Sequence, residues 1–212
     1  MIAFWTSGVA LAALLARLPA ARDDLGLNTA ELGLLLLCVS ASSVASLPTA
    51  GPVVARFGPA RTVLGGAVLV GLGQVLAALA LATTAVWLAA AALLFVGLGT
   101  GVWDVAMNVE GADVERRLGR SLMPRLHAAF SIGTVSGAGV SAVTAALDVP
   151  LAAQLAAVGL AGPVLVGAAT RCFLAAPQHT GSAEPRPRFG VRDAWREPRT
   201  VLVGLMVLGF AL

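Results

Sequence analysis

The sequence predicts an all-α membrane protein whose main part is a bundle of six transmembrane helices. Its composition is far from that of a soluble domain, because 58% of the 212 residues are hydrophobic, only 12% are charged and the mean hydropathy is +0.89. The apolar residues also form long segments that recur at regular intervals. Most of these segments reach the ~20 residues that a helix needs to cross ~30 Å of hydrocarbon.

The predicted spans follow one another along residues 1–175, which we expect to form a single transmembrane bundle. They are Ile2–Ala16, Leu32–Val54, Val63–Leu81, Val86–Val109, Leu126–Leu147 and Leu151–Leu174. The first span is short, so either the chain is truncated at its start or the helix continues through Leu18 to Pro19. It lacks the basic residues that open a signal peptide, and we expect it to be retained.

The last part of the sequence predicts a linker followed by the beginning of another helix. Residues 176–199 contain four prolines and mixed charge, which indicates a cytoplasmic linker. Residues 200–212 are apolar but too few to span a membrane. We interpret them as the truncated start of a seventh transmembrane helix, and we expect a whole protein of two bundles with about twelve helices, as in transporters built from repeats.

The basic residues predict the orientation of the chain. All fourteen are arginine, and twelve of them follow the second, fourth and sixth predicted spans. Because basic loops remain in the cytoplasm, we expect a multi-pass protein of the bacterial inner or plasma membrane with a cytoplasmic N-terminus. The pI of about 10.1 therefore reflects membrane topology. Nucleic-acid binding would need a basic face with interleaved aromatic residues, which the sequence lacks.

Asp104 is the most informative residue, because it is a lone acid inside the apolar segment Val86–Val109. The membrane interior penalises a carboxylate by roughly 2.5–3.5 kcal/mol on the insertion scale, so a retained acid usually faces inward and has a function. Asn108 lies one helical turn further on. Both side chains can bond the hydroxyl groups of a sugar or polyol, and Asp104 can also load and release a proton. The alternative is a structural acceptor for a donor on a neighbouring helix.

Three further polar residues within the predicted spans are candidates for binding protons or solute. His127 begins a polar stripe on the fifth span and can carry a proton near neutral pH, although a capping role explains it equally well. Gln74 and Gln154 lie on the third and sixth spans, where amides mostly bond to neighbouring helices. Contact with solute is the alternative for both. Glycines cluster on the third, fourth and fifth spans, where we expect them to allow close helix packing.

The loop between the second and third spans contains a motif of glycines and arginines. It reads Gly51-Pro-Val-Val-Ala-Arg56-Phe-Gly58-Pro-Ala-Arg61. This resembles the loop signature of the major facilitator superfamily, except that Ala55 stands where the family usually has Asp. The resemblance implies the N-terminal half of a transporter that works by alternating access, with Gly51, Arg56, Gly58 and Arg61 in a conformational loop. We expect the two arginines either to pair with Asp113 or Glu115 or only to set the topology.

The fourth span carries a more specific resemblance. Its motif, Gly97-Leu-Gly99-x-Gly101-x-x-Asp104-x-x-x-Asn108, is similar to helix 4 of the fucose permease-like sugar:proton symporters. In that branch the acid is a Glu that handles the proton and the sugar, which implies the same role for Asp104. The helix-1 acid of fucose permease has no counterpart within Ile2–Ala16, so the resemblance does not transfer the identity of the solute.

These patterns together predict a secondary active transporter of a small, sugar-like polar solute, coupled to protons through Asp104. The alternatives are proton-driven efflux of amphipathic compounds and a transport-inactive membrane sensor or scaffold. We expect no enzyme activity, because the sequence has no phosphate loop and no recognisable catalytic motif. We also expect no cofactor and no metal site. The expected partners are the solute, protons, the lipid bilayer and a C-terminal six-helix half, but no nucleic acid.

Overall fold

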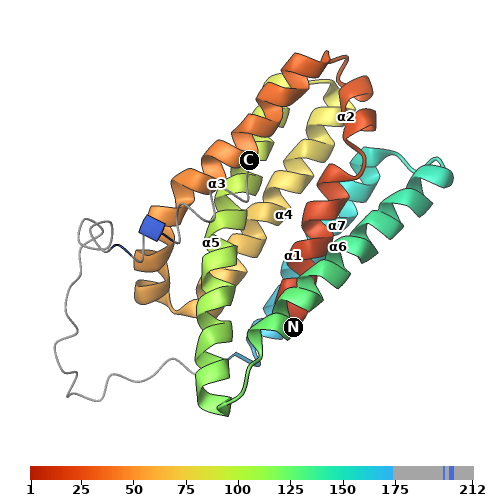
Figure 1. Cartoon of the computed structure of the whole chain (residues 1–212). Helices are drawn as coiled ribbons and strands as arrows, with labels where there is room; N and C mark the ends of the chain where they lie inside the picture. Colours follow the sequence, from red (N-terminus) through yellow and green to blue (C-terminus); the bar gives the residue numbers. More distant parts are fainter. Residues whose placement is uncertain (174–197, 199–200, 203–212) are drawn as a thin grey trace. The chain divides into compact units, whose positions relative to one another are not determined.

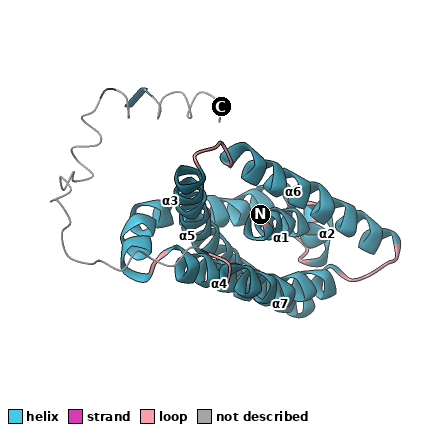
Figure 2. Cartoon of the chain, turned by 90° about the horizontal axis from the view of Figure 1, so that it is seen from below, coloured by secondary structure: helices cyan, strands magenta, loops and turns pink. Residues whose placement is uncertain are grey.

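The computed structural model describes residues 1–173, 198 and 201–202, and the first 173 residues form seven α-helices (Figures 1 and 2). These are α1 Ile2–Leu15, α2 Leu18–Asp24, α3 Thr29–Phe57, α4 Pro59–Thr83, α5 Val86–Leu118, α6 Met123–Ala146 and α7 Leu151–Thr170. No strand occurs in this part of the chain. Most of the predicted linker and of the predicted seventh span lies outside the described residues.

The helices confirm the predicted set of membrane spans. Five of them, α3 to α7, are long and apolar enough to cross a membrane, and α1 with α2 provides a sixth if the bent pair counts as one span. The first helix does not continue unbroken through Leu18 to Pro19: α1 ends at Leu15, and α2 begins at Leu18 with its axis turned by 45°. Pro19 explains the break, because its ring clashes with the carbonyl of Leu15 four residues earlier and it has no N–H to donate.

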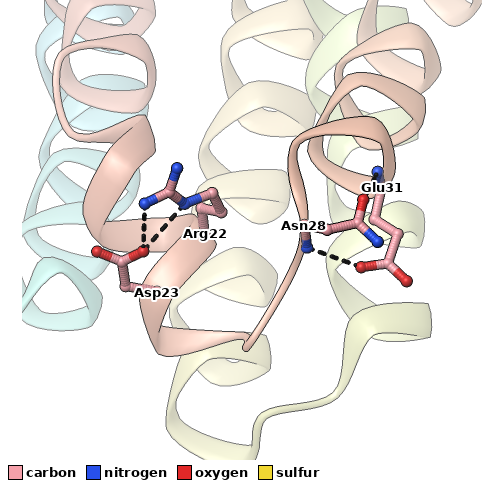
Figure 3. A network of polar contacts seen from close by, with 4 residues as sticks. All are labelled: Arg22, Asp23, Asn28 and Glu31. Carbon is pink, nitrogen blue, oxygen red and sulfur yellow. Dashed lines mark hydrogen bonds and ion pairs between the residues drawn. The ribbon is translucent and has the colours of Figure 1, made fainter.

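Local sequence signals set several helix ends. Asn28 and Glu31 form a capping box at the start of α3, in which the Glu31 N–H donates to Asn28 Oδ1 at 2.9 Å and the Asn28 N–H donates to Glu31 Oε2 at 2.8 Å (Figure 3). Arg22 forms an ion pair with Asp23 in α2 at 2.8 Å, and the same view shows this pair. Helix α5 continues past the predicted end at Val109 and ends at Leu118. Gly119 caps it in the left-handed conformation, with φ of +62°.

The helices pack in a definite order within the bundle. Helix α5 packs along α3 and α4, α4 packs along α7, and α1 packs on α7 and α6. The order is therefore α3, α5, α4, α7, α1, α6, and its two outer members are α3 and α6 (Figure 2). Two clusters of buried side chains fill the interior, one around Trp103 and Val63 and the other around Ala92 and Leu155.

Glycines make the close contacts between helices possible, as predicted. A Cβ on Gly101 of α5 would lie 2.7 Å from the Ser43 carbonyl oxygen of α3, and one on Gly137 of α6 would lie 2.8 Å from the Val9 carbonyl oxygen of α1. Gly71 of α4 and Gly159 of α7 face each other in the same way. Small residues permit such approach in lipid, where association depends on van der Waals packing between the helices.

Candidate functional site

Asp104 and Asn108 form a pair on the outward surface of α5. Asn108 Nδ2 donates to the Asp104 backbone carbonyl at 2.9 Å and to Asp104 Oδ1 at 3.3 Å. Asp104 is exposed and Asn108 is half-buried, whereas their neighbour Trp103 is only 2% exposed and lies in the core. The pair therefore points away from the interior of the six-helix bundle, near the middle of the long helix α5.

His127 brings a second helix to this pair. It lies in the second turn of α6, is exposed, and is within electrostatic range of Asp104. Its Nδ1 lies 3.0 Å from the Met123 carbonyl oxygen, and its ring packs against Phe4 of α1 with centroids 5.8 Å apart. We call Asp104, Asn108 and His127 the polar face. Helices α5 and α6 thus place a carboxylate, an amide and an imidazole together on one exposed surface.

The hydroxyls that follow His127 along α6 are used locally. Ser131 Oγ donates to the His127 carbonyl oxygen at 3.2 Å, and Thr134 Oγ1 donates to the Phe130 carbonyl oxygen at 3.1 Å. Such bonds to the preceding turn are the usual way for a hydroxyl to be satisfied in a membrane helix. They leave the oxygen lone pairs of Ser131, which is exposed, free to accept a hydrogen bond.

Gln74 and Gln154 do not join the polar face. Gln74 is 1% exposed and its Nε2 donates to the Ala10 carbonyl oxygen of α1 at 2.8 Å. Gln154 is 4% exposed and its Nε2 donates to Ser141 Oγ at 2.8 Å and to the Ala13 carbonyl oxygen at 3.3 Å. Both amides therefore attach α1 to the helices packed against it. A role in solute binding stays a prediction for both residues.

Arg17 completes the network around Gln154 through contacts that the sequence did not predict. One guanidinium nitrogen donates to the Val149 carbonyl oxygen at 2.8 Å and lies 3.4 Å from Gln154 Oε1, which also accepts from Thr144 Oγ1 at 2.6 Å. The arginine thus joins the break between α1 and α2 to the α6–α7 connection. The charge at the end of the first span was visible in the sequence, but its partners lie more than 130 residues away along the chain.

The conformational loop predicted between the second and third spans is a tight joint between two helices. Gly51 and Arg56 belong to α3, Arg61 lies in the first turn of α4, and Gly58 between the helices has φ of +80°. Only glycine adopts this conformation without strain. The Arg56 guanidinium lies over the Phe57 ring, 5.6 Å from its centroid.

The expected pairing of Arg56 or Arg61 with the acids of α5 is wrong. Asp113 instead pairs with Arg116 and Arg117 of its own helix at 2.9 and 3.0 Å, and Glu115 accepts backbone N–H bonds from the start of α6. Residues three and four apart on one helix face each other, so the local arginines reach Asp113 without any movement of the helices.

Comparison with known proteins bears on the family of this bundle. The sequence model described as Major Facilitator Superfamily matches residues 1–212, the whole length of the chain. The chain belongs to the major facilitator superfamily. This confirms the superfamily that the loop motif indicated, and with it a multi-pass membrane architecture that is all-helical in the described residues.

Two similar proteins, both named as transporters, extend the comparison. The chain is 38% identical to an uncharacterized MFS-type transporter of Yersinia pestis over 198 aligned residues. The alignment covers 92% of the chain and 49% of that protein. It is 31% identical to an uncharacterized transporter of Sinorhizobium fredii over 168 aligned residues. This alignment covers 77% of the chain and 44% of that protein. The chain thus spans about half the length of these curated relatives. No solved structure matches it.

Proposed function

We propose that this chain forms one half of a proton-coupled transporter of a small, sugar-like polar solute, which works by alternating access in a bacterial inner or plasma membrane. The relatives named as transporters support the general activity. The polar face supports the finer assignment, because a carboxylate, an amide and an imidazole lie together on the exposed surface of membrane-spanning helices.

The cost of exposing Asp104 to lipid is the central argument. A charged carboxylate in the middle of a membrane helix costs roughly 2.5–3.5 kcal/mol on the insertion scale. Direct contact of the Asp104 carboxylate with lipid is therefore unfavourable. The polar face therefore requires protein or water as its neighbour. A second bundle, which a protein of the relatives' length has room for, would enclose it at the interface where transporters of this architecture bind solute.

The chemistry of the polar face suits a hydroxylated solute. Asp104 uses one carboxylate oxygen toward Asn108, which leaves the other oxygen to accept a hydroxyl proton. Asn108 retains its carbonyl oxygen, so it can accept a hydrogen bond from a neighbouring hydroxyl. His127 adds an imidazole, whose ring nitrogens can donate or accept a hydrogen bond. The resemblance of the α5 motif to fucose permease-like symporters supports the same assignment.

Proton movement into vesicles tests this proposal directly. Full-length protein is reconstituted into vesicles, a panel of sugars and polyols is added in turn, and internal pH is followed for wild type, Asp104→Asn and the control Asp113→Asn. Solute-triggered proton uptake is expected in wild type and in Asp113→Asn, but not in Asp104→Asn. Equal uptake in Asp104→Asn would overturn the role of Asp104. No response to any sugar or polyol would overturn the choice of solute and favour efflux.

A further inference from the structure

Glu115 connects the end of α5 to the beginning of α6 by two short hydrogen bonds. Its Oε2 accepts the backbone N–H of Leu122 at 2.6 Å and that of Met123 at 2.7 Å. These residues are the N-cap and first residue of α6, whose N–H groups have no partner within the helix. A carboxylate at this position is favoured both by the charge-assisted bonds and by the helix dipole. We call Glu115, Leu122 and Met123 the Glu115 clasp.

The clasp adds a polar connection between α5 and α6, which otherwise contact each other over a short stretch near Gly111 of α5 and Leu126 of α6. Helix α5 packs along α3 and α4, whereas α6 packs along α1, and the direct contact between α5 and α6 is slight. The polar face nevertheless depends on both helices, since Asp104 and Asn108 lie on α5 and His127 lies on α6. The clasp holds the α6 start to α5 by direct hydrogen bonds, in addition to the packing of α6 along α1.

These hydrogen bonds connect Glu115 indirectly to His127 through Met123. Met123, which donates its N–H to Glu115, presents its carbonyl oxygen 3.0 Å from His127 Nδ1 one turn later. His127 in turn lies within electrostatic range of the Asp104 carboxylate. We propose that Glu115 is a positioning residue, which holds the first turns of α6 so that the His127 imidazole stays opposite Asp104. The part of this inference that concerns proton coupling rests on the proposed function.

Asp113 provides a matched control on the same helix end. It carries the same charge and lies two residues before Glu115, but its ion pairs go to Arg116 and Arg117 of α5 itself. Replacing Asp113 therefore removes one negative charge without releasing α6. Glu115→Gln is the conservative counterpart, because its amide oxygen can still accept two N–H bonds while the charge is lost.

Two measurements on the full-length transporter in lipid vesicles test the inference. In the first, spin labels at Leu47 of α3 and Ile132 of α6, both exposed, report the distance between the two outer helices in a background without other cysteines. Glu115→Ala is expected to displace and broaden this distance distribution, whereas Glu115→Gln and Asp113→Ala leave it as in wild type. This measurement needs no solute.

The second measurement is the kinetics of solute-triggered proton uptake in the same variants. Glu115→Ala is expected to lower the maximal rate about tenfold through misplacement of the imidazole. The solute concentration for half-maximal uptake should change little, because Asp104 and Asn108 remain on α5. Glu115→Gln should restore most of the rate.

The outcomes separate this inference from the proposed function. An unchanged distance distribution in Glu115→Ala overturns the clasp. A changed distribution with a wild-type maximal rate shows that α6 is held by Glu115 but overturns its part in proton coupling. A changed distribution without proton uptake in any protein, wild type included, supports the clasp and overturns the proposed proton coupling.

Discussion

Asn108 donates to both the backbone carbonyl and the carboxylate of Asp104, so the amide and the acid are held as one unit on a single turn of α5. Because all of these bonds stay within one helix, they orient the acid without joining it to the rest of the bundle. The pair can therefore be altered with little effect on the fold.

Asn108→Ala should impair transport without destabilising the protein. Within the described residues, the side chain bonds only to Asp104 on its own helix. Its loss would remove a hydrogen bond to a hydroxyl of the bound solute, which is worth about 0.5–1.5 kcal/mol. We expect the solute concentration for half-maximal proton uptake to rise by about tenfold, since about 1.4 kcal/mol of binding corresponds to that factor. Thermal unfolding of the purified protein should be unchanged. A lower melting temperature with unchanged transport would contradict this prediction.

Gln154→Leu should destabilise the bundle more than Gln74→Leu. Removing Gln154 leaves the buried Ser141 hydroxyl and the Ala13 carbonyl with lost partners, and we expect a cost of about 1–2 kcal/mol in the free energy of unfolding. Gln74 makes one hydrogen bond and has a buried Oε1 without a partner in the described structure, so its replacement removes an unfavourable group as well. Thermal unfolding in detergent compares the two variants, and equal melting temperatures would count against this assignment.

Gly133→Ala should disrupt the contact between α6 and α1. An added Cβ would meet the Trp5 backbone, with its Cα only 2.9 Å away, and a backbone cannot move aside as a side chain can. We expect a loss of about 1–3 kcal/mol. Gly139→Ala on the same helix is the control, because no neighbouring helix in the described part of the chain lies within 4 Å of its added Cβ. Alanine there should raise stability slightly through helix propensity. The yield of folded protein and its melting temperature give the readout.

Gly58→Ala should weaken the joint between α3 and α4. Its φ of +80° and ψ of 161° lie in a region that alanine enters at a cost of about 1–3 kcal/mol. Gly51→Ala, which lies within α3 with open space around its Cβ, should be neutral or slightly stabilising. Differential scanning calorimetry compares the thermal stability of the two variants, and the transport rate is measured in the same preparations. A Gly58→Ala protein as stable as wild type would show that the joint relaxes without strain.

Several features of the fold and the candidate site follow from local sequence. Hydrophobic length predicted the membrane spans, since a helix in lipid must satisfy its own backbone and its extent is set by the apolar segment. The spacing of four residues between Asp104 and Asn108 predicted that they share a face, and the structure shows that they bond to each other. The break at Pro19 and the extension of α5 to Gly119 also have local causes, although the apolar segments alone did not mark them.

The sequence by itself determined the six spans, the superfamily and the acid on the fourth span. Only the tertiary structure decided that His127 comes within electrostatic range of Asp104, that Gln74 and Gln154 bond to α1, that Arg17 reaches Val149 and that Glu115 bonds to the start of α6. The physical reason is that each of these contacts depends on which helices are neighbours and how each is rotated about its axis. Helix order and rotation come from packing at small residues across the whole bundle, and no single segment of the sequence contains that information.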